Sequence, residues 1–291
     1  MNFHNLHVIV VGGSSGIGRA MSRLLTGRGA HVSIIARRQE LLDETLAELE
    51  ERRENGTQRL QAFSADVTDW EQAQEAVVAL TAGGYPPDIL INAAGFSHPG
   101  YFEELPLEIM RETMEVDYFG TLHTIKAVLP MMMARRSGQI VNFASVAGFV
   151  GVFGYTAYGA AKFAVRGFSD ALRQELRPHG IHVAVVFPPN TETPGLDYED
   201  RFKPLETRRI EGQSQTRTAD QVAHIVVRGI ERKKTYILPG LDTKLYFLIA
   251  NGVVALRAFR WYFLDRVVTK ARRERDAQQS GPGIDRSWQV K

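Results

Sequence analysis

The stretch HVIVVGGSSGIG, residues 7–18, decides the fold that the rest of the chain completes. HVIVV is a short apolar run rich in β-branched residues, which predicts a buried strand. It leads directly into Gly12, Gly16 and Gly18, spaced G-x-x-x-G-x-G, and an amphipathic stretch from Ile17 to about Arg28 predicts a helix after them. Such a turn lets backbone N–H groups approach a pyrophosphate at a helix N-terminus. Glycines after a strand also form ordinary turns, but their place between the first strand and a helix favours a nucleotide site.

Strand-like and helix-like segments alternate along the chain. A charged helix is predicted from about Gln39 to Arg53, and further helical patterns fill most of the gaps between strands. The other predicted strands are residues 31–36, 60–65, 88–92, 139–144, 182–187 and 235–238. Alternating β and α units predict an α/β fold with a doubly wound parallel sheet covered on both faces, over residues 1–240. Ligands of such sheets bind beyond the carboxyl ends of the strands.

Composition excludes several classes of function. The 291 residues are 44% hydrophobic, enough for a large core, and the net charge of +2 gives no bulk attraction to nucleic acid. The absence of cysteine excludes disulfides and thiol catalysis, and the eight histidines form no H-x-x-x-H pair, so no metal site is expected. The basic run ARRER (271–275) lacks interleaved aromatic residues. No secretory signal precedes the first strand, which predicts a cytoplasmic protein.

The segments after the second, third and fourth strands carry residues suited to a dinucleotide. Arg37 and Arg38 follow the second strand, where NAD usually meets an acidic residue and the 2′-phosphate of NADP meets an arginine. We therefore predict NADPH as the cofactor; the alternative is that both arginines only flank a helix start in solvent. Asp66 follows the third strand, where its carboxylate can accept a hydrogen bond from an adenine amino group. Small residues follow the fourth strand in the run NAAG (92–95).

Tyr158 and Lys162 lie four residues apart in YTAYGAAK (155–162), so they share one face of a helix. A phenol ordinarily titrates near pH 10, and a fixed ammonium nearby lowers that pKa, which would let Tyr158 act as a general acid or base. Tyr155 is seven residues from the lysine and does not have this relation. The same spacing also occurs by chance in many helices. Ser145 follows the predicted strand 139–144, where a lone serine is most often a helix cap.

Together these motifs resemble the short-chain dehydrogenase/reductase family over about residues 5–240. The resemblance implies a Rossmann fold with strand order 3-2-1-4-5-6-7 and hydride transfer between a nicotinamide and a carbonyl or alcohol. It implies that Ser145 donates a hydrogen bond to the carbonyl oxygen and that Tyr158 delivers the proton. Lys162 would lower the pKa of Tyr158 and bind the nicotinamide ribose, and Thr193 would contact the carboxamide end of the cofactor. The full implied cofactor-binding set is Gly12, Ser14, Ser15, Gly16, Ile17, Gly18, Arg37, Arg38, Asp66, Val67, Asn92, Ala93, Gly95, Tyr158, Lys162, Pro188, Thr191 and Thr193.

Two positions depart from the family pattern. Val11 stands where the family usually has a threonine, which removes one hydroxyl hydrogen bond. Asp117, in DYFG (117–120), stands where the family has its fourth catalytic residue, an asparagine that supports a helix kink and a water relay to the lysine. Aspartate has the same shape without the NH₂ donors. If it is ionised it favours a protonated Lys162, and if it is buried it can be neutral. We expect activity because the other three catalytic residues are intact.

The segment PPNTETPG (188–195), followed by KPLETR (203–208), is similar to the 3-ketodihydrosphingosine (3-ketosphinganine) reductase subfamily. This similarity implies NADPH-dependent reduction of the 3-keto group of a long-chain amino ketone, and the segment lies where the fold usually has a mobile substrate lid. Acidic residues in it can offer charge to a substrate ammonium, or simply form a solvated loop; they are Glu192, Asp197, Glu199 and Asp200. Two alternatives stay open: reduction of another apolar carbonyl, such as a steroid, retinoid or fatty acyl ketone, and a non-catalytic NADPH-binding scaffold.

The C-terminal part is apolar and then basic. Residues 244–268 are rich in apolar and aromatic side chains, but the uninterrupted part, Leu245 to Leu256, is too short to span a bilayer. From Arg257 to Lys291 there are nine Lys or Arg and four Asp or Glu, an excess that anionic lipid would attract. We expect residues 241–275 to be an extension that contacts the cytoplasmic face of a membrane or packs in a homo-oligomer, a dimer or tetramer. Residues 276–291 are expected to form a flexible tail.

Overall fold

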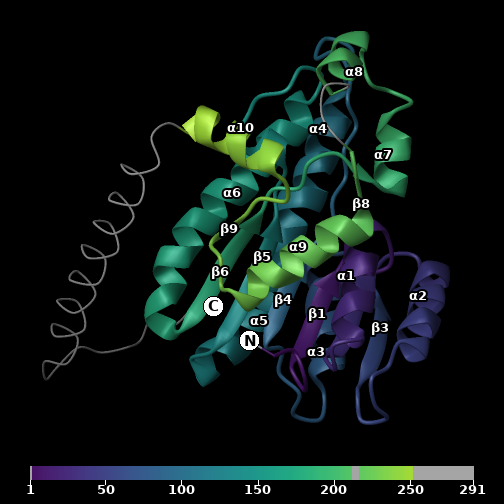
Figure 1. The fold of residues 1–291 in the computed structure, drawn as a ribbon, viewed down its shortest axis with the longest axis vertical. Coiled ribbons are helices and arrows are strands. Elements are labelled where there is room, and N and C mark those ends of the chain that lie inside the picture. The colour runs from purple at the N-terminus through teal and green to yellow at the C-terminus, as the bar shows by residue number, and fades with distance from the viewer. Residues whose placement is uncertain (1, 212–215, 252–291) are drawn as a thin grey trace, which may run out of the picture. The chain divides into compact units, whose positions relative to one another are not determined.

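A computed structural model describes residues 2–211 and 216–251 of the chain, and Met1–Ala250 fall into one compact unit. This unit is built on a seven-stranded parallel sheet (Figure 1). Its strands are β1 (His7–Val11), β2 (His31–Ala36), β3 (Leu60–Ser64), β4 (Ile89–Asn92), β5 (Gly138–Phe143), β6 (Ile181–Val186) and β9 (Tyr236–Ile237). Two of the strands match their predicted bounds and the others agree to within a few residues.

The strand order is β3-β2-β1-β4-β5-β6-β9. This confirms the predicted Rossmann order, with β9 as the seventh strand. The numbering differs because two short strands, β7 (Thr191–Glu192) and β8 (Arg217–Thr218), pair with each other outside the main sheet. Since β1 lies between β2 and β4, the chain reverses its direction of travel across the sheet beside β1. The glycine-rich turn after β1 therefore opens at the crevice where doubly wound sheets bind ligands.

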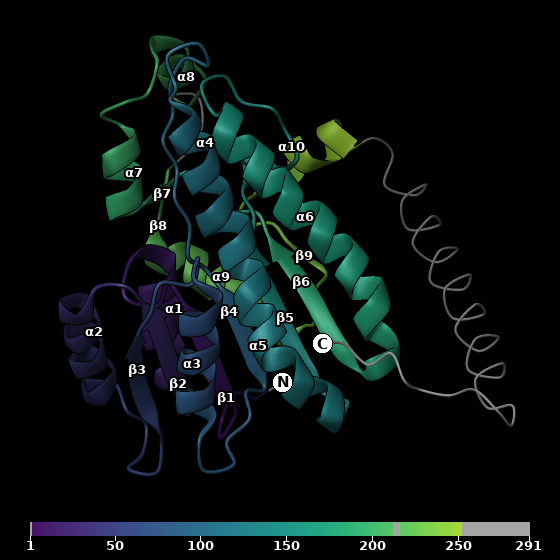
Figure 2. The same cartoon turned by 180° about the vertical axis from the view of Figure 1, so that it is seen from behind.

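Helices cover both faces of the sheet (Figures 1 and 2). One face carries α1 (Gly16–Thr26), α2 (Gln39–Glu51) and α9 (Ala219–Glu231), whose apolar side chains join one core cluster. The other face carries α3 (Trp70–Thr81), α5 (Gly120–Arg135) and α6 (Thr156–Leu176), whose apolar side chains join a second. Each helix has an apolar stripe wide enough to pack on the sheet, which accounts for the amphipathic patterns in the sequence.

The central strand β1 shows how the two cores are divided. Val8 and Val10 belong to the cluster under α1 and α9, whereas Ile9 and Val11 belong to the cluster under α3 and α5. Successive side chains of a strand point to opposite faces, so a strand covered on both faces has to be apolar throughout. All five residues of β1 are buried.

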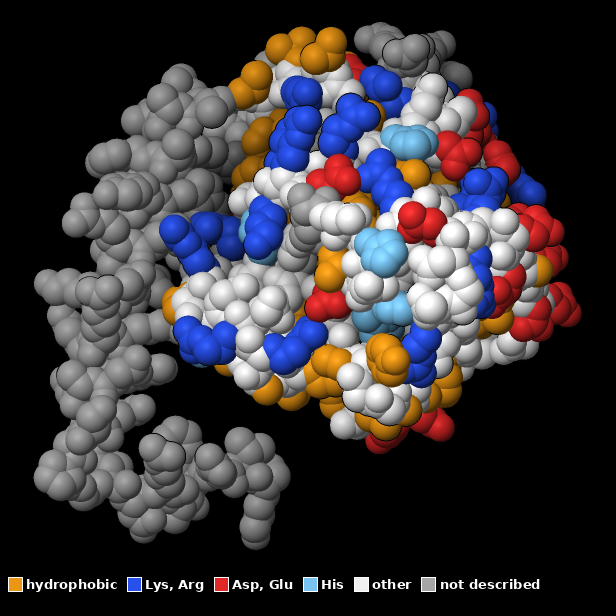
Figure 3. All heavy atoms as spheres, turned by 60° about the horizontal axis from the view of Figure 1, so that its bottom comes forward, with side chains coloured by type: hydrophobic (Ala, Val, Ile, Leu, Met, Phe, Trp, Pro, Cys, Tyr) orange, Lys and Arg blue, Asp and Glu red, His pale blue; other side chains and the backbone are white. Residues whose placement is uncertain are grey.

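The remaining elements gather near the carboxyl ends of the strands. Helix α4 (Leu107–Met114) passes through a single π-helical turn, Glu115–Phe119, into α5. Helices α7 (Pro194–Glu199), α8 (Leu205–Glu211) and α10 (Leu241–Asn251) lie in the same region, in the upper part of Figure 1. The opposite end of the molecule, turned forward in Figure 3, shows basic, acidic and histidine side chains interspersed.

The predicted C-terminal extension is described only in part. Helix α10 covers its first eleven residues, 241–251. The rest of the extension and the predicted flexible tail lie outside the described residues. No helix in the described ranges is long and apolar enough to cross a membrane.

The side chain of Ile9 is a test of how much the central strand contributes to stability. Ile9 is fully buried between β1 and the helices that cover it. Ile9→Ala should lower the free energy of unfolding by about 2–5 kcal/mol, because it removes apolar contacts and leaves a cavity. Denaturant unfolding measures the change. Val78→Ala, at a residue of α3 that is 63% exposed, is the control and should change stability by no more than about 0.5 kcal/mol. Equal losses in the two variants would contradict this account of the core.

Candidate active site

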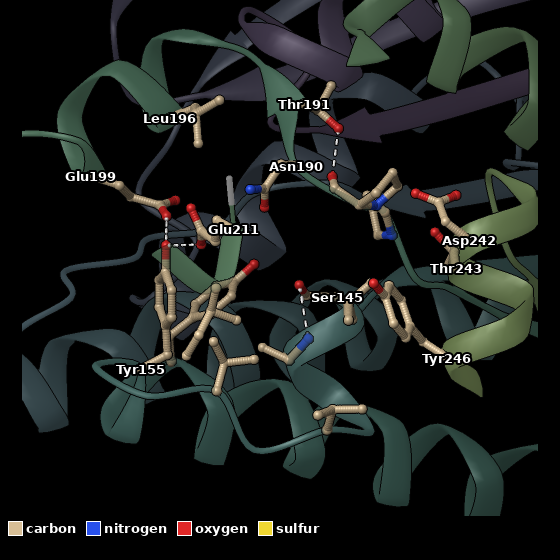
Figure 4. A pocket seen from close by; sticks show the side chains of 18 of the residues that line it. Ser145, Tyr155, Asn190, Thr191, Leu196, Glu199, Glu211, Asp242, Thr243 and Tyr246 are labelled. Carbon is tan, nitrogen blue, oxygen red and sulfur yellow. Dashed lines mark hydrogen bonds between the residues drawn. The ribbon is translucent and has the colours of Figure 1, made fainter. Parts of the chain in front are cut away.

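Two cavities meet at the carboxyl ends of the strands. The first, the glycine-loop cleft, has a volume of about 550 Å³ and is lined by the turn after β1 and by the segments that follow β2, β3 and β4. The second, the α7–α8 cavity, has a volume of about 570 Å³ and lies between the start of α6 and helices α7, α8 and α10 (Figure 4). Five residues line both cavities: Ile17, Tyr158, Pro188, Thr193 and Glu199. The two spaces are therefore contiguous, and the Tyr158 side chain lies where they join.

The turn after β1 brings two stretches of backbone into contact. Gly12 has a positive φ of 77°, and a Cβ atom placed on it would lie 2.6 Å from the backbone nitrogen of Ala94. Gly18 has no room either, because an added Cβ would lie 2.2 Å from the carbonyl oxygen of Gly12. Helix α1 begins directly after Ser15, whose side chain does not cap it. The first N–H groups of α1 are therefore left for a ligand, and this arrangement suits a pyrophosphate.

Residues that follow β2 and β3 form the far wall of the glycine-loop cleft. Arg37 and Arg38 line it, and the guanidinium of Arg37 lies 3.8 Å from the carboxylate of Asp66. Asp66 accepts hydrogen bonds from the N–H and the hydroxyl of Thr68, which fix its orientation. The arginines are exposed enough to meet a phosphate group, and Val67 lies beside them in the same wall.

Most, but not all, of the predicted cofactor-binding residues line the glycine-loop cleft. Those that do, apart from the wall just described, are Gly12, Ser14, Ser15, Gly16, Ile17, Ala93, Gly95, Tyr158, Lys162, Pro188 and Thr193. Asn92 is buried inside the sheet, where its amide donates to Asn142 and accepts from Thr124. Thr191 lines the α7–α8 cavity instead and donates to the carbonyl of Pro189. Gly18 does not line the cleft; it packs against the backbone of Gly12 in the turn after β1.

Ser145, Tyr158 and Lys162 come together as the sequence predicts. Ser145 follows β5, and its hydroxyl oxygen accepts a hydrogen bond from the N–H of Ala147. Tyr158 lies in the first turn of α6 and forms a side-chain hydrogen bond with Ser145. Lys162 lies one turn further on, with its Nζ 5.4 Å from the centre of the Tyr158 ring, and donates to the carbonyl of Phe143.

The acidity of Tyr158 differs from the expectation. Burial raises the pKa of Tyr158 well above its usual value, and the carboxylates of Asp117, Glu199 and Glu211 raise it further, while the hydrogen bond with Ser145 lowers it. The expected lowering of the pKa by Lys162 is not the outcome in the protein alone, because removal of the phenol from water outweighs the nearby cation. In this state Tyr158 holds its proton at neutral pH.

Asp117 lies in the π-helical turn, directly behind Lys162. It is fully buried, its Oδ1 accepts a hydrogen bond of 2.7 Å from the N–H of Phe96, and its Oδ2 lies 3.5 Å from Lys162 Nζ. Burial raises the pKa of Asp117, and the neighbouring Lys162 and the Phe96 N–H offset only part of that rise. The residue thus lies at the kink between α4 and α5, where the family resemblance predicts an asparagine.

An acidic wall of the α7–α8 cavity was only partly visible in the sequence. The Tyr155 hydroxyl lies 2.7 Å from Glu199 Oε2 and 2.9 Å from Glu211 Oε1 (Figure 4). The sequence singles out Glu199 as an acidic candidate, but Tyr155 lacks the helical spacing to Lys162 and no sequence pattern points to Glu211. Only the arrangement of α7 and α8 over the start of α6 brings the three together.

The sequence profile of the short chain dehydrogenase family matches residues 6–203. A 3-dehydrosphinganine reductase of Danio rerio is 39% identical over 229 residues, which are 78% of this chain and 69% of that protein. A 3-ketodihydrosphingosine reductase of Dictyostelium discoideum is 36% identical, over 89% of this chain and 81% of that protein.

Two solved structures share the fold and part of the sequence. An actinorhodin polyketide ketoreductase crystallised with NADPH has a TM-score of 0.69 and 31% identity, over 77% of this chain and 89% of that one. A short-chain dehydrogenase from Streptomyces avermitilis has a TM-score of 0.73 and 28% identity, over 90% and 98% of the two chains. This chain therefore belongs to the short-chain dehydrogenase/reductase family and is an oxidoreductase that uses a nicotinamide dinucleotide.

Proposed function

We propose that this enzyme reduces 3-ketodihydrosphingosine to dihydrosphingosine with NADPH. The observation that carries the proposal is the position of Tyr158, a buried and protonated phenol at the junction of a cleft suited to a dinucleotide and a second cavity of about 570 Å³. A proton donor there can reach a carbonyl in the second cavity. The names of the relatives supply the substrate.

The glycine-loop cleft suits NADPH, which when bound supplies the hydride that reduces the carbonyl carbon. Backbone N–H groups of the turn after β1 would hold the pyrophosphate. Arg37 and Arg38 would hold the 2′-phosphate, and no carboxylate stands in their place to favour a free 2′-hydroxyl. Asp66 would accept from the adenine amino group. Lys162 would bind the hydroxyls of the nicotinamide ribose, and Thr193 would contact the carboxamide.

Two side chains would act on the substrate carbonyl, and two more would act through one of them. Ser145 donates a hydrogen bond to its oxygen and stabilises the negative charge that develops there. Tyr158 then gives its proton to that oxygen, which completes the alcohol. Tyr158 keeps its proton at neutral pH until the negative charge develops on the substrate oxygen, although its raised pKa makes it a weaker acid than a phenol in water. Lys162 and Asp117 behind it would return a proton to the tyrosine after each turnover.

The α7–α8 cavity suits a long apolar chain with a polar head. Much of its lining is apolar: Val146, Ala147, Val150, Val152, Leu196, Ile210 and Tyr246. Polar side chains lie near Ser145, on the wall formed by Tyr155 and its carboxylate partners, and on α10, where Asp242 and Thr243 line the opposite side (Figure 4). Apolar side chains beside the cavity are exposed, among them Ile210 and Leu245. We propose that the extension from residue 241 brings this side of the enzyme to a membrane surface or to a second subunit, where a lipid substrate can enter.

A product assay tests the reaction. Purified full-length protein with NADPH should convert a long-chain 3-keto amino alcohol, presented in detergent or vesicles, to the corresponding amino diol, identified by mass. Reduction of steroid, retinoid or fatty acyl ketones should be less efficient in kcat/KM. Tyr158→Phe should lower kcat at least 100-fold, the scale of general acid catalysis, with NADPH affinity nearly unchanged.

The control for this assay is Tyr85→Phe, at an exposed tyrosine that lines neither cavity; it should leave kcat unchanged. Cofactor binding without turnover of any ketone would refute the proposed reaction and favour a non-catalytic NADPH-binding scaffold. Full activity of the Tyr158→Phe variant would show that another group donates the proton.

The cofactor preference depends on the two arginines after β2. Replacing both, Arg37→Ala with Arg38→Ala, should raise the KM for NADPH about tenfold to a hundredfold, because hydrogen bonds to a charged phosphate are lost. The KM for NADH should change much less, since NADH lacks that phosphate. Steady-state kinetics with both cofactors gives the comparison, and Arg111→Ala, at an exposed arginine of α4, is the control. A parallel rise for both cofactors would contradict the assignment.

Asp117 should leave a signature in the pH dependence of stability. Because burial raises its pKa, the folded chain keeps a proton that the unfolded chain loses above about pH 3.9. The free energy of unfolding of the wild type therefore falls as pH rises through this range. Asp117→Asn has no such proton, so the difference in unfolding free energy, variant minus wild type, should grow as pH rises above about 3.9, the unfolded-state pKa of aspartate. Denaturant unfolding measures it, and a constant difference would mean that Asp117 is ionised throughout.

A further inference from the structure

The acidic wall of the α7–α8 cavity has fewer hydrogen-bond donors than its carboxylates can accept. A phenol has one hydrogen to donate, yet the Tyr155 hydroxyl lies within 2.9 Å of oxygens from both Glu199 and Glu211. It can serve only one of them at a time. Lys203 Nζ lies 2.6 Å from Glu211 and 2.7 Å from Asp200, so its ion pairs are with those two residues. Glu199 is left with a shared phenol.

The charge of this wall is also unbalanced. With both glutamates ionised, Glu199, Glu211 and the buried Lys203 sum to one negative charge, and Asp200 outside them is largely solvated. Burial raises the pKa of Glu199 to about 7, although Tyr155 and Lys203 oppose the rise. A half-buried carboxylate in that condition either takes up a proton or gains from a cation that enters the cavity.

The acidic wall lies beside the reacting groups. The rings of Tyr155 and Tyr158 are 5.7 Å apart, and Glu199 lines both cavities together with Tyr158. The Glu199 carboxylate is close enough to raise the pKa of Tyr158. In an α-amino ketone the amine-bearing carbon is bonded directly to the carbonyl carbon, so the nitrogen lies roughly 3 Å from the carbonyl oxygen. A substrate with its carbonyl at Ser145 and Tyr158 would thus have its ammonium within reach of this wall.

The carboxylates are held in place from outside the cavity. Next to Glu199, Tyr198 shares a hydrogen bond of 2.8 Å with His98, and the ring of Phe202 lies against both. These contacts fix the end of α7. Glu211 is anchored by its ion pair with Lys203. A carboxylate that is already held in place loses little conformational entropy when a cation binds, and this favours binding.

We propose that Glu199, supported by Glu211, binds the ammonium group of the substrate and so selects amino ketones over ketones that lack the amine. The inference rests on the proposed reductase function and adds to it the residue that sets its specificity. An ammonium brings three N–H donors and one positive charge. It therefore supplies the hydrogen-bond donors that the acidic wall lacks and balances its excess negative charge. Tyr155 then keeps its single hydrogen bond, and the carbonyl stays at Tyr158.

The test compares two ketones and two variants of the full-length enzyme with NADPH. One substrate is a long-chain 2-amino-3-ketone, and the other is the same ketone with hydrogen in place of the amine. Glu199→Gln keeps the size of the side chain and removes its charge. It should raise the KM for the amino ketone about 10- to 100-fold, the effect of losing a hydrogen bond to a charged group. The KM for the amine-free ketone should not change, and any change in kcat that arises because Glu199 no longer raises the pKa of Tyr158 should be shared by both ketones. Glu199→Asp, which keeps the carboxylate, should recover part of the lost affinity.

Asp197→Asn is the matched control, because Asp197 is an exposed carboxylate of the same helix and lines neither cavity. It should behave as wild type on both ketones. Equal increases in KM for both ketones in Glu199→Gln, or no increase for either, would overturn the proposal. The acidic wall would then have only a structural role, in holding α7 against α6. NADPH binding confirms that each variant is folded. If the wild type reduces neither ketone, the proposed function itself fails and this inference fails with it, an outcome distinct from equal losses in an active enzyme.

Discussion

The organisation of this enzyme depends on one close contact, the approach of the Gly12 backbone to that of Ala93 and Ala94. No side chain fits between them, since even a Cβ atom on Gly12 would lie 2.6 Å from the Ala94 nitrogen. The contact holds the turn after β1 against the end of β4, where the order of strands reverses. It thereby opens the crevice beside β1, exposes the N-terminus of α1, and brings the ends of β4 and β5 to one cleft. The residues with a proposed role in catalysis lie around this crevice.

Burial, rather than the lysine, dominates the acidity of the central tyrosine. A cation one helical turn away should make a phenol more acidic, but the loss of water around Tyr158 and three carboxylates nearby have the opposite effect. Proton transfer can still proceed in a reductase, because the alkoxide formed from a ketone is a stronger base than a phenolate. The oxidised cofactor that forms in the reaction carries a positive charge at its ring and would shift the balance back. In the proposed mechanism the lysine would therefore serve as a ligand of the ribose and a link in proton return, rather than as the sole cause of tyrosine acidity.

The sequence predicted the parts of the molecule that depend on local pattern. Periodicity predicted the strands 7–11 and 31–36 and, with spacing, the glycine turn. Spacing and the family resemblance predicted that Ser145, Tyr158 and Lys162 lie together. What it could not give depends on packing between distant segments. Asn92 lies at the end of a strand, as a ligand-binding residue would, but its side chain is hydrogen-bonded to Asn142 inside the sheet. Tyr155 contacts Glu211 only because α8 folds over the start of α6. The direction of the shift in the Tyr158 pKa could not be predicted for the same reason. The spacing of Tyr158 and Lys162 in the sequence does not indicate how deeply the phenol is buried.

Asp117, which stands where the family resemblance predicts an asparagine, separates what shape requires at this position from what charge requires. The π-helical turn at residues 115–119 turns the side chain inward, and the Phe96 N–H holds its Oδ1 at 2.7 Å, a bond that either an amide or a carboxyl oxygen can accept. The kink therefore needs only an oxygen of the right size. The second oxygen, 3.5 Å from Lys162, is where the two residues differ, because an amide would offer N–H donors and a carboxyl offers a site for a proton. A buried carboxyl with a raised pKa next to a lysine can hold that proton itself. In this enzyme the relay behind the tyrosine can thus include a side chain that titrates, whereas an asparagine would only position water.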